Sequence, residues 1–275
     1  MNTVGASTSP RHFLTTLRLR AADGAELNLT GATITPDMIP NTPVVLSTAI
    51  GGDDICEKDF PAGAAAGKIV VCKRGRVDGR AATSFTVKQG GGVGEILYNP
   101  TRQNLFTDNF WVRTVMLEGP EPANTMLAFL AAHSGVTATW KTGVPTHVRP
   151  DEMTVFSSRG PDGDFIKPDV TAPGLQILAG TTPTPWGAVA SGPSGELFMA
   201  IAGTSMSSPH AAGVSALIKA AHPDWTPGQI KSAMMTSSVQ DVVKNDGHTP
   251  SDPFDRGAGS CSRRRPRRRP GRRSS

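Results

Sequence analysis

The sequence predicts an α/β protein in which a compact α+β module is set between two parts of a larger domain. Three observations lead to this fold class. The chain has 275 residues, which is enough for one large domain or two ordinary ones. Between residues 22 and 142, short β-branched runs alternate with two helix-like segments. From Arg149 the pattern changes to strand and loop, followed by helices.

The first predicted element is a strand, "TVGAS" (3–7), in a segment that we place at residues 1–21. The chain reaches this strand almost without a lead-in, so we expect that Met1 is not the natural beginning of the fold. The opening residues, "MNTVGASTSPRHF", also lack the basic and apolar regions of a signal peptide.

The α+β module is placed at residues 22–142. Its predicted strands are short β-branched runs bounded by Gly, Pro or Asn: "TPVVLS" (42–47), "GKIVVCKRG" (67–75) and "GEILYN" (94–99). Helices are predicted at 79–91 and 121–135, and each ends at glycine. The module also contains the glycosylation sequon Asn28-Leu29-Thr30, a pattern that often arises by chance and matters only in a eukaryotic secretory setting.

Three cysteines allow at most one internal pair. Cys56 and Cys72 lie in one local region of the module, and Cys261 lies near the C-terminus. A Cys56–Cys72 disulfide in an exported protein and two separate thiols fit these positions equally well.

The third segment, residues 143–260, begins as strand and loop and ends in helices. Within it, "TPGQIKSAMMTSS" (226–238) predicts a helix. Thr226 is a good N-cap for this helix, and Pro227 suits the first helical position.

The charge of the chain is concentrated in a tail at residues 261–275, "CSRRRPRRRPGRRSS", which holds eight arginines and no acid. The other 260 residues carry 20 basic and 23 acidic side chains, so we expect neither a nucleic acid nor a membrane surface as a partner. A run of about 18 apolar residues, as a membrane span requires, is absent. We favour a reading-frame error in GC-rich coding sequence as the origin of the tail. A basic tail that binds nucleic acid or an acidic surface and a solvated tail without function are the alternatives.

The stretch "GTSMSSPHAAGVSALIKAAHP" (203–223) places three serines at the start of a predicted helix. Residues 211–218 are small or apolar on every face, which predicts a buried helix, with Pro209 near its first turn. The free N–H groups and positive dipole end of such a helix would stabilise negative charge that develops near Ser205. Serines that only cap the helix would give the same local pattern.

His210 follows Ser205 by five residues, which rotates the two side chains about 140° apart on a helix. Only residues three or four positions apart are neighbours on a helix, so we expect His210 to be a packed helix residue. A base for Ser205 would have to come from elsewhere in the protein.

The run "GTSMSSPHAAGVSALIKAAHPDWTPGQIKSAMMTSS" resembles the nucleophile region of subtilisin-like serine proteases, the subtilases. The family motif is Gly-Thr-Ser-x-Ser/Ala-x-Pro, and its first serine, here Ser205, is the nucleophile. "VFSSRGP" (155–161) and "KPDVTAPG" (167–174) are similar to the two family segments that precede it, in the same order. "TVGAS" resembles the strand before them, and "DPFDRGAGS" (252–260) resembles the segment after them.

The resemblance implies an incomplete subtilisin-like parallel-sheet catalytic domain, made of residues 1–21 and 143–260. The module at 22–142 is similar to a protease-associated (PA) domain through "GKIVVCKRG", the following helix and "GGVGEILYN". Such inserts influence substrate access or assembly and carry out no chemistry. In this plant-like subgroup a cysteine upstream of the "IVVC" strand is often its disulfide partner, which favours the Cys56–Cys72 pair.

In the family the chain order is Asp, His, oxyanion-hole Asn and Ser, and the first three precede "TVGAS". We therefore expect all three to be absent from these 275 residues. The remaining histidines do not lie in a His-Gly-Thr motif and are expected to be structural or exposed: His12, His133, His147, His222 and His248. The residues around Ser205 are read as support for the motif: Gly203, Thr204, Met206, Ser207, Ser208 and Pro209.

The resemblance thus implies a serine endopeptidase that works through an acyl-enzyme, with Ser205 as nucleophile and its backbone N–H as oxyanion donor. We expect a protein or peptide substrate, no cofactor and no metal, an extracellular or secretory location, and an inactive chain when it is alone. The oligomeric state stays open. The alternative is a non-catalytic binding or interaction protein that acts through the PA-like module.

Overall fold

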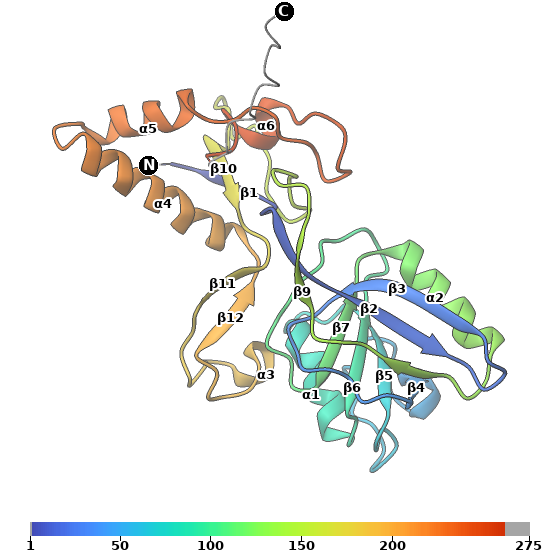
Figure 1. Cartoon of the computed structure of the whole chain (residues 1–275). Helices are drawn as coiled ribbons and strands as arrows, with labels where there is room; N and C mark the ends of the chain where they lie inside the picture. The colour runs from blue at the N-terminus through green and yellow to red at the C-terminus, as the bar shows by residue number, and fades with distance from the viewer. Residues whose placement is uncertain (1, 262–275) are drawn as a thin grey trace, which may run out of the picture. The chain divides into compact units, whose positions relative to one another are not determined.

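The structure is a computed structural model that describes residues 2–261, and the tail predicted at 261–275 lies almost wholly outside them (Figure 1). Two compact units share the chain. Unit 1 combines Met1–Thr8, Arg149–Gly174 and Gly203–Ser275, and unit 2 combines Ser9–Val148 and Leu175–Ala202. Each unit is therefore built from segments that are far apart in the sequence.

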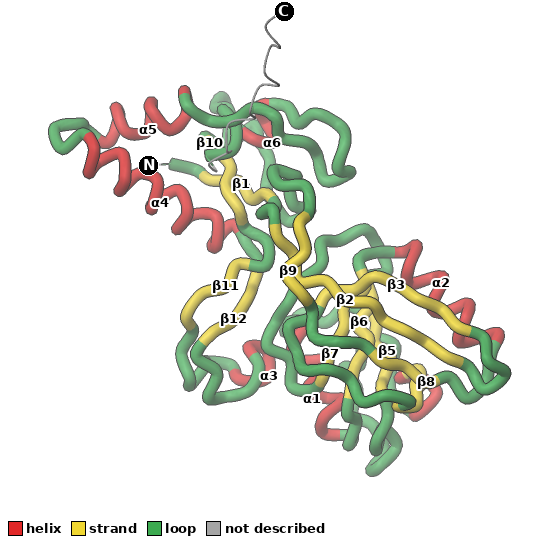
Figure 2. Tube along the Cα trace, viewed as in Figure 1, coloured by secondary structure: helices red, strands yellow, loops and turns green. Residues whose placement is uncertain are grey.

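Unit 2 contains an eight-stranded sheet in the order β3-β7-β6-β5-β4-β8-β2-β9 (Figure 2). Its strands are β2 (Arg11–Arg20), β3 (Glu26–Ala32), β4 (Thr42–Leu46), β5 (Ile69–Lys73), β6 (Gly94–Tyr98), β7 (Arg113–Leu117), β8 (Thr137–Thr139) and β9 (Val144–His147). Strands β4 to β7 are parallel to one another. Because β2 also pairs with β3, the sheet closes on itself, and β9 extends it along the first half of β2.

The core of unit 2 lies inside this closed sheet and beneath α2 (Pro120–Ala132). Strand β5 is buried at four of its five positions, which explains its nearly continuous apolar sequence, whereas the second half of β2 (16–20) alternates buried and exposed residues. The core includes Leu17, Leu19, Ile69, Val71, Ile96, Val115, Leu117, Met126 and Trp140. The short helix η1 (Ser47–Ile50) follows β4, and α1 (Arg80–Gln89) connects β5 to β6.

The predicted strands at 42–47, 67–75 and 94–99 are confirmed as β4, β5 and β6, and the predicted helices at 79–91 and 121–135 as α1 and α2. The boundaries of the module differ from those expected at residues 22 and 142. Strand β2 pairs with β3, β8 and β9, so residues 9–21 belong to unit 2 rather than to the segment of "TVGAS". On the other side β9 carries unit 2 to Val148.

A second difference concerns residues 175–202, which the sequence placed in the catalytic segment. They contain β11 (Ile177–Gly180), α3 (Ala188–Ser191) and β12 (Phe198–Ile201), and they pack in unit 2. The reason is a set of long-range hydrogen bonds between side chains and carbonyl oxygens. Gln176 Nε2 donates to Leu105 O (3.0 Å), Thr107 Oγ1 to Ala200 O (3.1 Å), Asn109 Nδ2 to Phe198 O (2.9 Å) and Trp111 Nε1 to Val189 O (3.1 Å).

The described part of unit 1 has a parallel pair of strands, β1 (Val4–Ser7) and β10 (Val170–Pro173), with three helices. The helices are α4 (Thr204–Ala221), α5 (Pro227–Thr236) and α6 (Pro253–Arg256). Thr226 is the N-cap of α5 and Pro227 follows it, as predicted from the sequence, and Gln229 completes a capping box with Thr226. Val170, Ala211 and Met234 form the buried contact among β10, α4 and α5.

The prediction that α4 is buried on every side is wrong for the described residues. Only Ser207 and Ala211 are buried in this helix, and Leu217 is 74% exposed. The physical reason is that α4 contacts the narrow β1–β10 pair and α5, which together cover one face of a helix.

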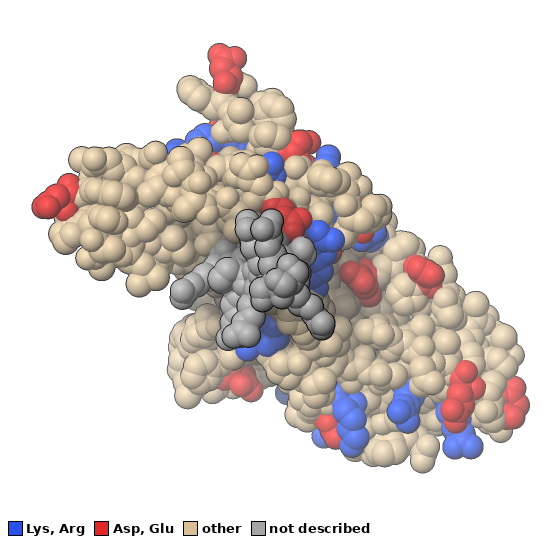
Figure 3. All heavy atoms as spheres, turned by 45° about the horizontal axis from the view of Figure 1, so that its top comes forward, with Lys and Arg blue, Asp and Glu red and all other residues tan. Residues whose placement is uncertain are grey.

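Acidic and basic side chains are interspersed over the face drawn in Figure 3. Within the described residues, no helix combines the length and the apolar character that crossing a bilayer requires.

Candidate functional site

The predicted nucleophile Ser205 lies in the first turn of α4, one residue after the helix begins at Thr204. Gly203 is the N-cap, and its N–H donates to the carbonyl oxygen of Gly174 (2.8 Å). No side chain caps this helix, so the interpretation of the serines as caps alone is wrong. The side chain of Ser205 is exposed and forms no hydrogen bond with another described residue.

The helix starts earlier than the sequence predicted, which places Pro209 inside α4 rather than near its first turn. Proline has no N–H to donate to the carbonyl oxygen four residues earlier, so the Ser205 carbonyl lacks its regular helical partner. Ser208 Oγ donates to Thr204 O (3.2 Å), while Ser207 Oγ is buried without a hydrogen-bond partner in the described part of the chain. Each of the three serines therefore has a different environment.

Gly174 and the start of α4 approach each other closely. A Cβ atom at Gly174 would overlap with Ser207 Oγ and would lie 2.8 Å from Gly203 O. Only glycine fits at this position without a shift, and the small side chain of Ser207 completes the contact. The segments "KPDVTAPG" and "GTSMSSPH" thus meet directly beside Ser205.

Four of the five segments that resemble the family come together around β1. The backbone N–H of Ala6 donates to Ser157 Oγ (3.0 Å), which joins "TVGAS" to "VFSSRGP". The backbone N–H of Thr3 donates to Asp169 Oδ2 (2.8 Å), which joins the same strand to "KPDVTAPG". A cavity of about 380 Å³ opens beside these segments, lined by Thr3, Val4, Ser158, Arg159, Pro161, Asp162, Lys167, Pro168 and Thr204.

The carboxylate of Asp169 connects several of these segments through ion pairs and a hydrogen bond. Its carboxylate accepts from Lys167 Nζ and Lys231 Nζ (both 2.9 Å) as well as from the Thr3 N–H. Burial opposes ionisation of Asp169, but these hydrogen bonds outweigh it and keep the pKa of the carboxyl below its ordinary value. The charged network fixes the loop that leads into β10.

Three of the histidines lie in unit 1, and none of them hydrogen-bonds to Ser205 in the described residues. His210 Nδ1 contacts the carbonyl oxygen of Met206 (2.8 Å), so its ring is directed to its own helix. His222 stacks on Trp225 with ring centroids 3.8 Å apart, and His248 contacts Asp246.

The other histidines lie in unit 2 and have structural environments or exposed positions. His12 is half-buried in β2, and burial lowers its pKa below the ordinary value. His133 pairs with Asp23 (2.8 Å), and His147 is exposed on β9. Among residues 2–261 there is no group of three or more acidic, histidine or cysteine side chains that could hold a metal ion.

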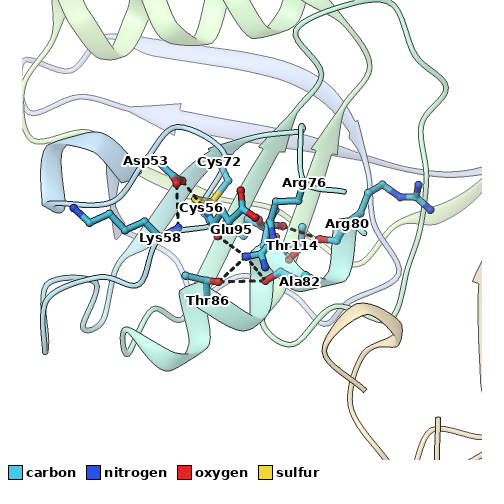
Figure 4. The surroundings of a disulfide bond; sticks show 12 residues. Asp53, Cys56, Lys58, Cys72, Arg76, Arg80, Ala82, Thr86, Glu95 and Thr114 are labelled. Atoms are coloured by element: carbon cyan, nitrogen blue, oxygen red, sulfur yellow. Dashed lines mark hydrogen bonds between the residues drawn. A yellow bond between two sulfur atoms is a disulfide. The ribbon is translucent and has the colours of Figure 1, made fainter. Parts of the chain in front are cut away.

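Cys56 and Cys72 form a disulfide that joins the loop after η1 to strand β5 (Figure 4). Both residues are fully buried. Arg76 supports the bond from the side of α1, because its Nη1 donates to Cys56 O (2.8 Å) and to Thr86 Oγ1 (2.9 Å). The positions of the cysteines left this pairing open, the family resemblance favoured it, and the disulfide confirms it. The contacts of Arg76 were not predicted from the sequence.

Glu95 is a second feature of unit 2 that the sequence analysis missed. It is fully buried on β6, and its Oε2 accepts from Thr114 Oγ1 (3.1 Å), while Oε1 has no partner in the described chain (Figure 4). Burial raises its pKa to about 8. The signal that could have revealed it is a single acid within the apolar strand "GEILY".

The segments that meet around β1 and Ser205 are those by which the sequence resembles a known family. The Subtilase family model matches residues 3–259, so the chain is a member of the subtilase family.

Two curated relatives come from Arabidopsis thaliana. The subtilisin-like protease SBT1.3 is 35% identical over 283 residues, which cover 94% of this chain and 36% of that protein. The subtilisin-like protease SBT1.7 is 36% identical over 218 residues, which cover 71% and 28%. The chain thus spans about a third of the length of these relatives. A solved structure, the psychrophilic subtilisin-like protease Apa1 from Pseudoalteromonas sp. AS-11, matches at 15% identity with a TM-score of 0.34, covering 94% of this chain and 51% of that one.

Proposed function

We propose that this chain supplies the nucleophile-bearing part of a subtilisin-like serine endopeptidase. The observation that carries the proposal is the exposed Ser205 in the first turn of α4, within "GTSMSSP" and beside Gly174. Ser205 Oγ attacks the scissile carbonyl carbon to form an acyl-enzyme, and the Ser205 backbone N–H binds the oxyanion. Gly203, Thr204 and Met206 to Pro209 hold this turn in place.

The base that takes the proton from Ser205 is assigned to a histidine outside these 275 residues, together with its orienting aspartate and the second oxyanion donor. The environments of the six histidines in the chain support this assignment, since none of them hydrogen-bonds to Ser205 in the described residues. The substrate is a protein or peptide. No cofactor is assigned to the reaction.

The inserted module is proposed to be a PA-type domain that influences substrate access or assembly. Its support is that unit 2 has its own core and lies between segments of unit 1 in the sequence. An extracellular or secretory location is part of the same proposal. The buried Cys56–Cys72 disulfide supports it, because such bonds persist in oxidising compartments.

Labelling with a fluorophosphonate probe tests the assignment of Ser205. We expect no Ser205-dependent labelling of the purified chain, since loss of the base alone costs about 10⁶ in turnover in subtilisin. The second polypeptide to be tested is a fusion, called the joined polypeptide, in which the part of SBT1.3 that precedes the matched region is placed before this chain. We expect the probe to label the joined polypeptide at Ser205.

The matched control for both polypeptides is Ser205→Ala. Labelling of the joined polypeptide that survives this substitution would overturn Ser205 as the nucleophile. Labelling of the chain alone that disappears with it would overturn the assignment of the base outside the chain.

The alternative is a non-catalytic binding protein that acts through unit 2. The observation that favours it is that unit 2 has a complete core and a cavity of about 580 Å³ on the outer face of β2, whereas Ser205 has no base in the described chain. Saturable peptide binding to the cavity, together with no Ser205-dependent labelling of either polypeptide, would favour this function.

A further inference from the structure

The outer face of β2 and β3 carries a modification motif that the proposed protease function does not use. We propose that Asn28 is an N-glycosylation site and that its oligosaccharide covers this face of unit 2. The proposal rests on the secretory location inferred above. It is carried by the exposure of Asn28, by its neighbours on the sheet and by the buried disulfide.

The sequon Asn28-Leu29-Thr30 lies in the middle of β3, where alternate residues point to opposite faces. Leu29 packs against the core of unit 2, whereas Asn28 and Thr30 are both exposed on the outer face. Neither of the two polar side chains hydrogen-bonds to another described residue. The acceptor amide and the hydroxyl that the motif requires are therefore on one accessible surface.

The pairing of β2 with β3 places polar groups beside the sequon. Asn28 lies opposite Arg18, and Thr30 lies opposite Thr16, so the side chains of each pair are neighbours on the same face. Arg18 forms no ion pair with a described residue. The guanidinium and the hydroxyls can donate hydrogen bonds to the first sugars of a glycan.

The same face is hollowed by a cavity of about 580 Å³. Six threonines, two cations and three apolar residues line it: Leu14, Thr15, Thr16, Arg18, Thr30, Thr139, Trp140, Lys141, Thr142, Val144 and Thr146. This surface has the size and the hydroxyl-rich character to accommodate sugars that extend from Asn28.

A second tripeptide with asparagine first and threonine third, Asn99-Pro100-Thr101, differs from the sequon at Asn28. Proline at the middle position disqualifies this tripeptide as an acceptor. Asn99 is also fully buried, and its Nδ2 donates to Leu117 O (2.7 Å). No third Asn-x-Ser/Thr pattern exists in the 275 residues, so the glycan is assigned to Asn28 alone.

The disulfide is an observation independent of the sequon. Cys56 and Cys72 are joined and fully buried in the same unit, and disulfides form and persist mainly in oxidising compartments. In a eukaryote, the compartment where such bonds form is also the one where lipid-linked oligosaccharides are transferred to asparagine. The two modifications of unit 2 thus have one common requirement.

The transfer is a substitution without oxidation or reduction. The Asn28 side-chain nitrogen attacks the anomeric carbon of an oligosaccharide linked through pyrophosphate to a lipid. A C–N bond forms as the C–O bond to the pyrophosphate breaks. The lipid pyrophosphate leaves with the bonding electron pair, and one amide proton passes to a base.

The test is translation of the full chain, fused to a cleavable leader peptide, in the presence of rough microsomes. Glycosylation during translocation does not require the product to fold, so a folding defect in a variant does not obscure the result. We expect one shift in electrophoretic mobility that peptide-N-glycosidase reverses, with conversion of Asn28 to aspartate located by mass spectrometry. Asn28→Gln and Thr30→Ala should abolish the shift, whereas Thr30→Ser should retain it.

The matched control is Asn124→Gln, which removes an exposed asparagine that is not in a sequon and should leave the shift unchanged. Absence of the shift in a chain that enters the microsomes and forms the Cys56–Cys72 disulfide overturns the inference and leaves the secretory location standing. A purified natural protein with free Cys56 and Cys72 thiols overturns the secretory location instead. A shift that persists in Asn28→Gln also overturns the inference.

Discussion

Glu95 is a buried carboxyl group on the face of β6 opposite the core residue Ile96, and its ionisation links the stability of unit 2 to pH. Its pKa of about 8 in the folded chain lies far above the value of an exposed glutamate. At a pH below the pKa of Glu95 in the unfolded chain, Glu95 is protonated in both the folded and the unfolded state, so its ionisation does not lower the free energy of unfolding. The free energy of unfolding falls as the pH rises towards 8, because Glu95 ionises only in the unfolded state. The total loss of free energy of unfolding is about 5 kcal/mol.

We therefore predict that Glu95→Gln flattens the fall in the free energy of unfolding between pH 5 and pH 9. The Gln amide oxygen can still accept from Thr114 Oγ1, while the charge is removed. Urea unfolding at a series of pH values measures the effect. An equally steep fall in the variant would contradict the assignment to Glu95.

Gly174 has a steric role at the start of α4, because an added Cβ would overlap with Ser207 Oγ and approach Gly203 O. Gly174→Ala is predicted to lower the free energy of unfolding of unit 1 by about 1–3 kcal/mol, the usual cost of overpacking. In the joined polypeptide described above it should also reduce the rate of labelling at Ser205.

Gly213→Ala is the matched control for this prediction. It lies in the interior of α4, and an added Cβ has no neighbour within 4 Å. Alanine should therefore stabilise the helix by about 1 kcal/mol. Equal effects of the two substitutions would show that the contact with Ser207 is unimportant.

At the scale of elements, the disulfide ties the loop after η1 to strand β5 across a sequence separation of 16 residues. Replacing Cys56 and Cys72 together by alanine is predicted to lower the free energy of unfolding of unit 2 by about 3 kcal/mol, as expected for a loop of this size. Chemical denaturation measures the loss. Cys261→Ala removes the free thiol of unit 1 and should change the unit 2 transition little, so a comparable loss there would contradict the prediction.

The elements that could be predicted are those whose pattern of apolar and turn residues is contained in a short stretch of sequence. Strands β4, β5 and β6 are apolar runs between turn residues, and α5 has its cap and first-turn proline in the sequence. Strand β2, "RHFLTTLRLR", was missed because its first half shows no clean alternation and its pairing partners lie far along the chain.

The candidate site was only partly predictable for the same reason. The motif around Ser205 is local, so the sequence is enough to propose this residue as the nucleophile. The burial of α4 depends on how much surface its neighbours cover, which no local pattern reports. The membership of residues 175–202 in unit 2 depends on hydrogen bonds from Thr107, Asn109 and Trp111, which are about 80 to 90 residues away in the chain.

At the scale of the whole molecule, each unit is discontinuous in the chain. The segments of unit 1 are separated by unit 2, and the last segment of unit 2 lies between β10 and α4. Neither unit can therefore be isolated as one continuous fragment. The experiments proposed above use the full chain for this reason.

The pairing of β2 with β9 has a consequence for the order of folding. It places Arg11 opposite His147, so a folded sheet brings the two ends of the insert together, next to where Thr8 Oγ1 bonds to Arg149 O. Strands β1 and β10, with Val4 opposite Val170, would otherwise have to close a loop of more than 160 residues. With Arg11 and His147 paired, the remaining loop between Val4 and Val170 has about 30 residues, and this shortening saves about 1.5 kcal/mol of chain entropy. The eight strands of this sheet lie within residues 11–147, so all of them emerge before β10 during synthesis.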